Sequence, residues 1–172
     1  MPRTTQKIWT DSEKVLVIYF SRSGNTREIA HRIHQIVGGD IVEIEPADPY
    51  PEDYNAVVKQ AKAELNSGYK PPLKSKIENI ESCDVIFLGS PNWLQTIAPP
   101  VQSFLSQADL SGKTIAPFIT HGGGGSGRSV ADIAELCQES TILDALVVRG
   151  CKPGKNAIAE WLSKLFRRSH KL

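Results

Sequence analysis

A loop of small, hydrogen-bonding residues follows the first strongly apolar run of the chain. Residues 15–20 are all apolar or aromatic, and the next six positions read SRSGNT. Glycine lets the backbone approach a ligand, and N–H groups at the start of a following helix can converge on an anion. The loop contains no acidic side chain. We therefore predict that a phosphate binds to a site made by Ser21, Arg22, Ser23, Gly24, Asn25 and Thr26.

Other phosphate-binding motifs do not match this loop. A Walker loop requires GxxxxGK[ST] and a dinucleotide fingerprint requires GxGxxG, and neither opens the first helix. Position 21 is serine, where a receiver domain would carry aspartate and a low-molecular-weight phosphatase would carry cysteine. The alternative interpretation is an ordinary strand–helix turn in which the hydroxyl groups only cap the helix.

A second candidate loop follows the apolar run at 83–89. It consists of Ser90, Pro91, Asn92 and Trp93, and an amphipathic segment begins soon afterwards. A tryptophan at the end of a strand offers an aromatic face for stacking, and the asparagine offers a nearby amide. The alternative is that Trp93 only covers the core beneath a loop.

A third candidate loop follows the apolar run at 114–120 and is rich in glycine. Residues 121–127 read HGGGGSG, so peptide groups could lie directly against a flat ligand. Such a tract also resembles a flexible linker, but here a strand precedes it and a predicted helix at 129–139 follows it. His121, Gly122, Gly123 and Gly124 are the candidate ligand-binding residues, and His121 could equally close the strand by a backbone hydrogen bond.

The first loop, Ser21-x-Ser23-Gly24-x-Thr26, resembles the [ST]-x-[ST]-G-x-[ST] loop with which the flavodoxin family holds the phosphate of FMN. In that resemblance, the loop at 90–93 covers the flavin ring and the loop at 121–124 contacts its polar edge. The resemblance implies FMN as the cofactor, bound by the residues of all three loops. It extends over residues 14–166, which we expect to form a single domain with terminal extensions at 1–13 and 167–172.

The apolar pattern predicts the elements that hold these loops. Strands are expected at 15–20, 41–45, 83–89, 114–120 and 142–148, and they alternate with helices at 26–37, 52–65, 101–105, 129–139 and 156–166. This alternation predicts a doubly wound α/β fold with a parallel five-stranded sheet in the order 2-1-3-4-5, the flavodoxin-like sandwich.

Helical spacing also predicts which side chains face the core. They are Ile29, Ala30, Ile33 and Val37 in the first helix, Tyr54, Val57, Val58, Ala61 and Leu65 in the second, and Ile158, Ala159, Leu162, Leu165 and Phe166 in the last. The segment at 49–54, with its two tyrosines, is similar to that of short bacterial flavodoxin-like proteins. Those tyrosines could approach the flavin or could simply anchor a turn.

Charge distinguishes the chain from the usual electron carriers of that family. The formal net charge is +1, and the predicted flavin loops contain Arg22 and His121 but no Asp or Glu. Electron-carrier flavodoxins generally surround the flavin with carboxylates, which repel the reduced anion and steer basic partners. The sequence therefore supports FMN binding more strongly than it supports a carrier with a low reduction potential. The basic tail at 166–172 is too short to predict nucleic-acid binding.

Composition limits the remaining classes. The chain has three widely spaced cysteines and four histidines without ligand spacing, so we expect reduced thiols and no metal. Its amino-terminal residues lack the apolar region of a signal peptide, and no apolar run reaches membrane-spanning length. We expect a cytoplasmic protein without membrane or nucleic-acid partners.

Two functional classes follow from the resemblance. In the first, the protein is a one-electron carrier between a flavoprotein reductase and an electron acceptor, and no side chain is catalytic because the flavin carries the electrons. In the second, it is an NAD(P)H-dependent FMN oxidoreductase acting on quinones or related small molecules. The absence of the insertions found in larger flavodoxin-like quinone reductases favours the carrier. The sequence does not predict the oligomeric state.

Overall fold

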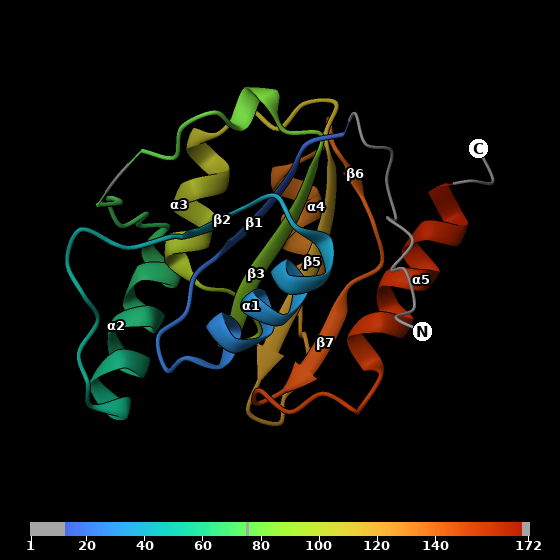
Figure 1. Ribbon diagram of the computed structural model, residues 1–172. Helices are drawn as coiled ribbons and strands as arrows, with labels where there is room; N and C mark the ends of the chain where they lie inside the picture. The colour runs from blue at the N-terminus through green and yellow to red at the C-terminus, as the bar shows by residue number, and fades with distance from the viewer. Residues whose placement is uncertain (1–12, 75, 170–172) are drawn as a thin grey trace.

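The computed structural model describes residues 13–74 and 76–169, with side chains as far as residue 165 at the carboxyl end. A mostly parallel sheet lies between two layers of helices (Figure 1). Its strands are β1 (Val15–Tyr19), β2 (Asp40–Glu43), β3 (Val85–Trp93), β4 (Thr96–Ile97), β5 (Thr114–His121), β6 (Thr141–Ile142) and β7 (Leu146–Arg149). The helices are α1 (Asn25–Val37), α2 (Tyr54–Ser67), α3 (Pro99–Gln107), α4 (Ser129–Leu136) and α5 (Ala157–Ser169), with a short 3-10 turn η1 (Ile80–Ser82).

The strand order is β2-β1-β3-β5, and both β6 and β7 pair with the far side of β5. β6 pairs with the beginning of β5 and β7 with its end, so the two are halves of the one strand predicted at 142–148. With this correction, the predicted α/β fold and the order 2-1-3-4-5 are confirmed. The short β4 was not predicted; it folds back antiparallel on the end of β3.

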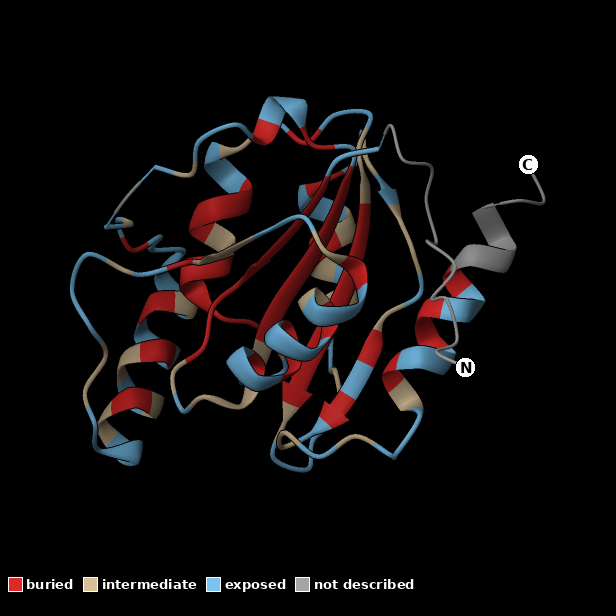
Figure 2. Ribbon diagram, in the orientation of Figure 1, coloured by how far each residue is buried: buried red, intermediate tan, exposed pale blue. Residues whose placement is uncertain are grey.

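The central strand β1 is buried on both of its faces, which is why its sequence shows no polar alternation. Leu16, Ile18 and Phe20 belong to the core layer shared with α3 and α4. Val15, Val17 and Tyr19 belong to the layer shared with α1 and α5. Figure 2 shows the strands at the centre of the sheet as the most continuously buried part of the molecule.

The first two helices show where the apolar pattern succeeds and where it fails. All four residues predicted to be buried in α1 are buried, and the helix ends at Val37 as predicted, followed by Gly38 with a φ of 71°. In α2, Val57 and Ala61 are buried, but Tyr54 is 71% exposed and its prediction as a core residue was wrong. α2 begins at Tyr54, after Asp53 caps it by accepting a hydrogen bond from the Ala56 N–H, so Tyr54 lies in the exposed first turn.

The last helix needs a similar correction. Ile158, Leu162 and Leu165 are buried as predicted, but Ala159 is exposed, and Trp161 takes part in the core instead. Its indole N–H donates to the carbonyl of Asp144 over 2.8 Å, which satisfies the polar end of a buried ring. The side chains of residues 166–169, residues 170–172 and the amino-terminal extension before residue 13 lie outside the described part of the chain, so the predictions for Phe166 and for the basic tail are not tested. Among the described helices, none is both long and apolar enough to cross a membrane.

Candidate functional site

The three predicted loops meet at the carboxyl edge of the sheet, where they enclose one cavity of about 280 Å³ with the first turns of α2. This is where α/β folds of this kind bind ligands. The lining residues are Arg22, Ser23, Asn25, Thr26, Tyr54, Val57, Val58, Ala61, Pro91, Asn92, Trp93, Leu94, Thr120, His121 and Gly122. The volume lies near the lower limit of small-molecule pockets, which suits a ligand that keeps one edge in solvent.

The loop after β1 forms a tight turn into α1. Gly24 adopts a left-handed conformation with φ 98°, and its N–H donates to the Ser21 hydroxyl over 3.1 Å. Its carbonyl then accepts the Glu28 N–H, which forms the first helical hydrogen bond. The first N–H groups of α1 have no partner within the helix, so they remain available to an anion at this end.

Two buried threonines lie at the base of this loop. The Oγ1 atoms of Thr26 and Thr120 are 2.8 Å apart, and both residues are almost completely buried. Thr120 lies on β5 opposite Pro91 of β3, so the contact joins the first loop to the middle of the sheet. Since two hydroxyl groups carry two protons and this hydrogen bond uses one, the pair has one O–H left to donate.

The segment at 90–93, predicted as a loop, is the end of β3, and it forms a β-hairpin with β4 that carries an aromatic cluster. Trp93 pairs with Thr96 across the turn, and its ring packs edge-on against Tyr50 and Phe20, with ring centroids 5.0 and 5.4 Å away. Trp93 is therefore partly a core residue, as the alternative interpretation held, and it also lines the cavity. The two residues at the tip, Leu94 and Gln95, both have positive φ.

The glycine-rich loop after β5 is fastened to this hairpin. The Asn92 side chain donates from Nδ2 to the carbonyl of Gly125 over 2.6 Å, and the Arg128 N–H donates to the carbonyl of Gln95 over 2.7 Å. The first of these bonds fixes the orientation of the amide. It leaves the Oδ1 of Asn92 buried without a hydrogen-bond partner among the described residues, so this atom can accept a donor from a ligand.

His121 closes the end of β5 through local hydrogen bonds. Its Nδ1 accepts the N–H of Gly123 over 3.0 Å, and its carbonyl accepts the N–H of Gly150 from the loop after β7. His121 thus makes the backbone hydrogen bonds that the sequence suggested as an alternative to ligand binding. The acceptor role of Nδ1 places the proton of a neutral His121 on Nε2.

The cavity lining contains a cation but no carboxylate among the described residues. The guanidinium of Arg22 donates to the carbonyl of Glu52 over 2.8 Å, which holds the side chain across the mouth between β1 and α2. Behind the lining, Tyr50 donates to the buried Glu64 over 2.7 Å, and burial followed by this hydrogen bond raises the pKa of the phenol well above its usual value. The electrostatics suit an anionic ligand.

Nine of the fourteen predicted site residues line the cavity, and five do not. Ser21 and Gly24 shape the turn behind it, and Gly123 and Gly124 continue the third loop beyond it. Ser90 is fully buried. Its hydroxyl donates a hydrogen bond to the carbonyl of Pro91 and accepts one from the N–H of Ala98, so it already acts as donor and as acceptor within the protein.

The remaining lining residues were not among the predicted binding residues. Most come from α2: Tyr54, whose approach to the ligand the sequence left open, with Val57, Val58 and Ala61. Leu94 and Thr120 complete the set. The apolar positions of α2 read as core positions, and only the packing of that helix shows that they border a cavity. The sequence did offer a signal for Thr120, which is the last buried residue of β5 and directly precedes the glycine-rich loop.

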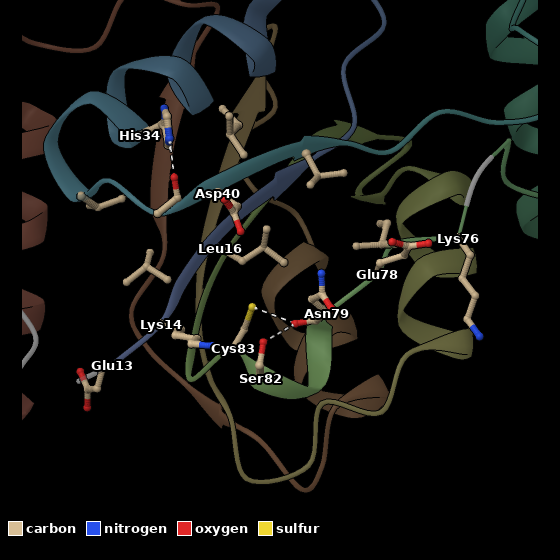
Figure 3. Close-up of a pocket in the computed structure, with 16 residues that line it drawn as sticks. Glu13, Lys14, Leu16, His34, Asp40, Lys76, Glu78, Asn79, Ser82 and Cys83 are labelled. Carbon is tan, nitrogen blue, oxygen red and sulfur yellow. Dashed lines mark hydrogen bonds between the residues drawn. The ribbon is translucent and has the colours of Figure 1, made fainter. Parts of the chain in front are cut away.

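A larger hollow of about 1230 Å³ lies at the other end of the strands, where the amino ends of β1 and β2 are found (Figure 3). Both acidic and basic side chains line it, namely Glu13, Lys14, Asp40, Lys76 and Glu78. His34 bonds the carbonyl of Gly39, and Ser82 and Cys83 both bond the carbonyl of Asn79. It lies at the amino ends of the strands, away from the predicted loops, so we place the functional site in the smaller cavity.

Comparison with known proteins gives one family. A family model described as flavodoxin matches residues 14–165. A candidate flavoprotein from Bacteroides eggerthii is 33% identical, with a TM-score of 0.79 over 88% of this chain and 97% of that one. A flavoprotein from Lactobacillus acidophilus, solved in complex with FMN, is 22% identical, with a TM-score of 0.68 over 87% and 98%. An NADH:FMN oxidoreductase is 11% identical, with a TM-score of 0.56 over 91% and 89%. No curated protein matches the chain.

Proposed function

The chain belongs to the flavodoxin family, and from this premise we propose that it binds FMN at the carboxyl edge of its sheet and carries electrons between a flavoprotein reductase and an electron acceptor. The meeting of three loops around one cavity without carboxylates supports the binding of anionic FMN. The carrier is favoured over an oxidoreductase because the sequence lacks the insertions of larger flavodoxin-like quinone reductases. Bound FMN would supply the redox chemistry, since its ring accepts and releases electrons.

The residues present fit FMN at both ends of the cavity. Ser23, Thr26 and the first N–H groups of α1 would hold the phosphate, with Thr120 behind them. Asn92 and the backbone at His121 and Gly122 would border the ring or its side chain, since the unpartnered Oδ1 of Asn92 needs a donor. The apolar and aromatic groups of Trp93 and α2 would exclude water from the remaining surface.

The test begins with the purified protein. We expect a yellow protein whose released flavin is identified as FMN by chromatography, and the apoprotein should bind FMN more tightly than riboflavin. Ser23→Ala should weaken FMN by about 1.5–3 kcal/mol, because it removes a hydrogen bond to a charged group, and should leave riboflavin nearly unaffected. Equal losses for both flavins would place the phosphate elsewhere.

The second candidate function is an NAD(P)H-dependent FMN oxidoreductase acting on quinones or related small molecules. The structural similarity to an NADH:FMN oxidoreductase keeps it open, but at 11% identity that similarity concerns the fold alone. For the carrier we expect slow direct reduction by NADH or NADPH and faster reduction through a flavoprotein reductase. Rapid NAD(P)H oxidation in the presence of a quinone would decide for the oxidoreductase.

A further inference from the structure

Exposed cations gather on one side of the cavity, in the loops that follow β5 and β7. We call Arg128, Arg149, Lys152 and Lys155 the basic flank; all four side chains are exposed. The two segments that contain them, residues 114–131 and 145–159, have no Asp or Glu. Within the described part of the chain, no carboxylate pairs with Arg149, Lys152 or Lys155, and Arg128 is 3.6 Å from Asp132.

Backbone contacts hold the end of β7, which carries Arg149, against the glycine-rich loop. His121 and Arg149 are register partners on β5 and β7, and the N–H of Gly150 donates to the carbonyl of His121 over 2.8 Å. A Cβ on Gly123 would lie 4.0 Å from the guanidinium of Arg149, so this cation borders the glycine-rich loop. Both loops lie at the same edge of the sheet in Figure 1.

Carboxylates occupy the other side of the cavity, in the segment between β2 and α2. Glu45 lies 3.6 Å from Lys74, and Asp53 is used to cap α2. Asp48 and Glu52 are exposed in the same segment. The carboxyl edge is thus divided, with the acidic groups beside β2 and the basic flank beside the glycine-rich loop.

We propose that the basic flank is the docking surface for an acidic redox partner protein. This inference rests on the proposed function, because it assumes that electrons pass through the cavity that the flank borders. Uncompensated charge next to such a site steers oppositely charged partners and raises their association rate. The observation that selects an acidic partner is this excess of positive charge: Arg149, Lys152 and Lys155 have no carboxylate partner among the described residues, and neither segment that carries the basic flank contains Asp or Glu.

The first test uses small probes of opposite charge. The FMN-loaded protein is reduced, freed of reductant and mixed with ferricyanide or with hexaamminecobalt(III); one electron leaves the reduced protein and converts iron(III) to iron(II), or cobalt(III) to cobalt(II). Raising NaCl from low to near-physiological concentration should slow the ferricyanide reaction by at least about threefold and accelerate the cobalt reaction. The opposite salt dependence would overturn the proposal.

Matched variants separate local charge from net charge. Lys152→Glu and Lys155→Glu should each slow the ferricyanide reaction, whereas Lys76→Glu makes the same charge change at the opposite edge of the sheet and should have little effect. FMN affinity, measured by fluorescence, should be unchanged in all three. Equal effects of the three substitutions would mean that only net charge matters and would overturn the proposal.

A third test uses proteins of opposite charge as electron acceptors. The reduced protein should transfer electrons faster to an acidic plastocyanin than to a basic c-type cytochrome, and Lys152→Glu should reduce this preference. A faster reaction with the basic cytochrome would overturn the proposal. If the protein does not bind FMN, the proposed function itself fails. If it binds FMN and instead oxidises NADPH, but not NADH, in a reaction that Lys152→Glu abolishes, the flank recognises a nucleotide phosphate and partner docking is wrong.

Discussion

The hydroxyl groups of Thr26 and Thr120 act as a pair because they are buried together and share one hydrogen bond. Whichever of them donates within the pair, the other keeps an O–H with no acceptor in the pair. An unused buried donor costs free energy, and a phosphate oxygen would remove that cost. In the proposed FMN complex one hydroxyl would orient the other, so we propose Thr120 as a positioning residue even though it lies far from residues 21–26 in sequence.

We predict that substitutions of these two threonines will not be additive. Thr26→Val should weaken FMN binding by about 1.5–3 kcal/mol, because a hydrogen bond to a charged group is lost. Adding Thr120→Val should cost little more, because the pair supplies only one donor to the ligand. FMN and riboflavin affinities of the four proteins, with Thr120→Ser as the control that keeps the hydroxyl, measure this coupling. Independent, additive losses would contradict it.

Trp93 has two roles that a pair of substitutions can separate. Trp93→Ala should weaken FMN by about 0.5–1.5 kcal/mol beyond the effect of lost burial and should increase flavin fluorescence, because an aromatic neighbour is removed. Trp93→Phe should keep most of the affinity. Titration of the apoprotein and thermal unfolding are measured together. A fall in stability with unchanged flavin affinity and fluorescence would make Trp93 a core residue only.

At the scale of elements, the hairpin between β3 and β4 has an unusual turn. Its two central residues, Leu94 and Gln95, have φ of 53° and 72°, a conformation for which Asn-Gly is the favoured sequence. The turn is held by the Arg128 N–H and by the hydrogen bond between Thr96 and Asp132. Gly127 fits against it because a Cβ there would lie 2.6 Å from the carbonyl oxygen of Gln95.

We predict that relieving this turn will stabilise the protein. Replacing Leu94 and Gln95 by Asn and Gly should raise the free energy of unfolding by about 1–2 kcal/mol, because a left-handed conformation is costly for most residues. Gly127→Ala should lower it by at least about 1 kcal/mol, because the added Cβ strikes the turn. Urea unfolding measures both changes. A less stable Asn-Gly variant would show that the side chains of Leu94 and Gln95 contribute more than the turn costs.

At the scale of the whole molecule, burial controls the reactivity of the three free cysteines. Cys83 and Cys137 are buried, and burial raises the pKa of both thiols, that of Cys137 to about 11. Cys151 is partly exposed in the loop after β7. Because the thiolate is the reactive form, a buried thiol with a raised pKa reacts only after the fold opens.

We therefore predict that iodoacetamide at pH 8 will label Cys151 first. Mass spectrometry of digested samples should find Cys137 unmodified under native conditions, and its labelling should begin only as urea approaches the unfolding transition. Cys151→Ser should abolish the early reaction. Labelling of all three cysteines at similar rates in the native protein would contradict the buried environment of Cys83 and Cys137.

The sequence by itself determined the strands, the helices and the three turn segments, because apolar runs and turn residues are local signals. The strand order then followed from the alternation of strands and helices and from the right-handedness of their connections. Residues 15–20 indicate a buried strand because all six are apolar or aromatic, and the glycine with neighbouring hydroxyls at 21–26 indicates a tight turn into a helix. The same signals identified nine of the cavity-lining residues.

Only the tertiary structure decided which residues from distant parts of the chain contact one another. The threonine pair joins residues 94 positions apart, and the contact of Asn92 with Gly125 spans 33. The exposure of Tyr54, the burial of Glu64 beneath Tyr50, and the internal hydrogen bonds of Ser90 follow from how α2 and β4 pack. The periodicity of a helix or strand shows which of its faces is apolar. Whether that face packs in the core or lines a cavity depends on elements that are distant in sequence, and a local pattern carries no information on how far away they lie.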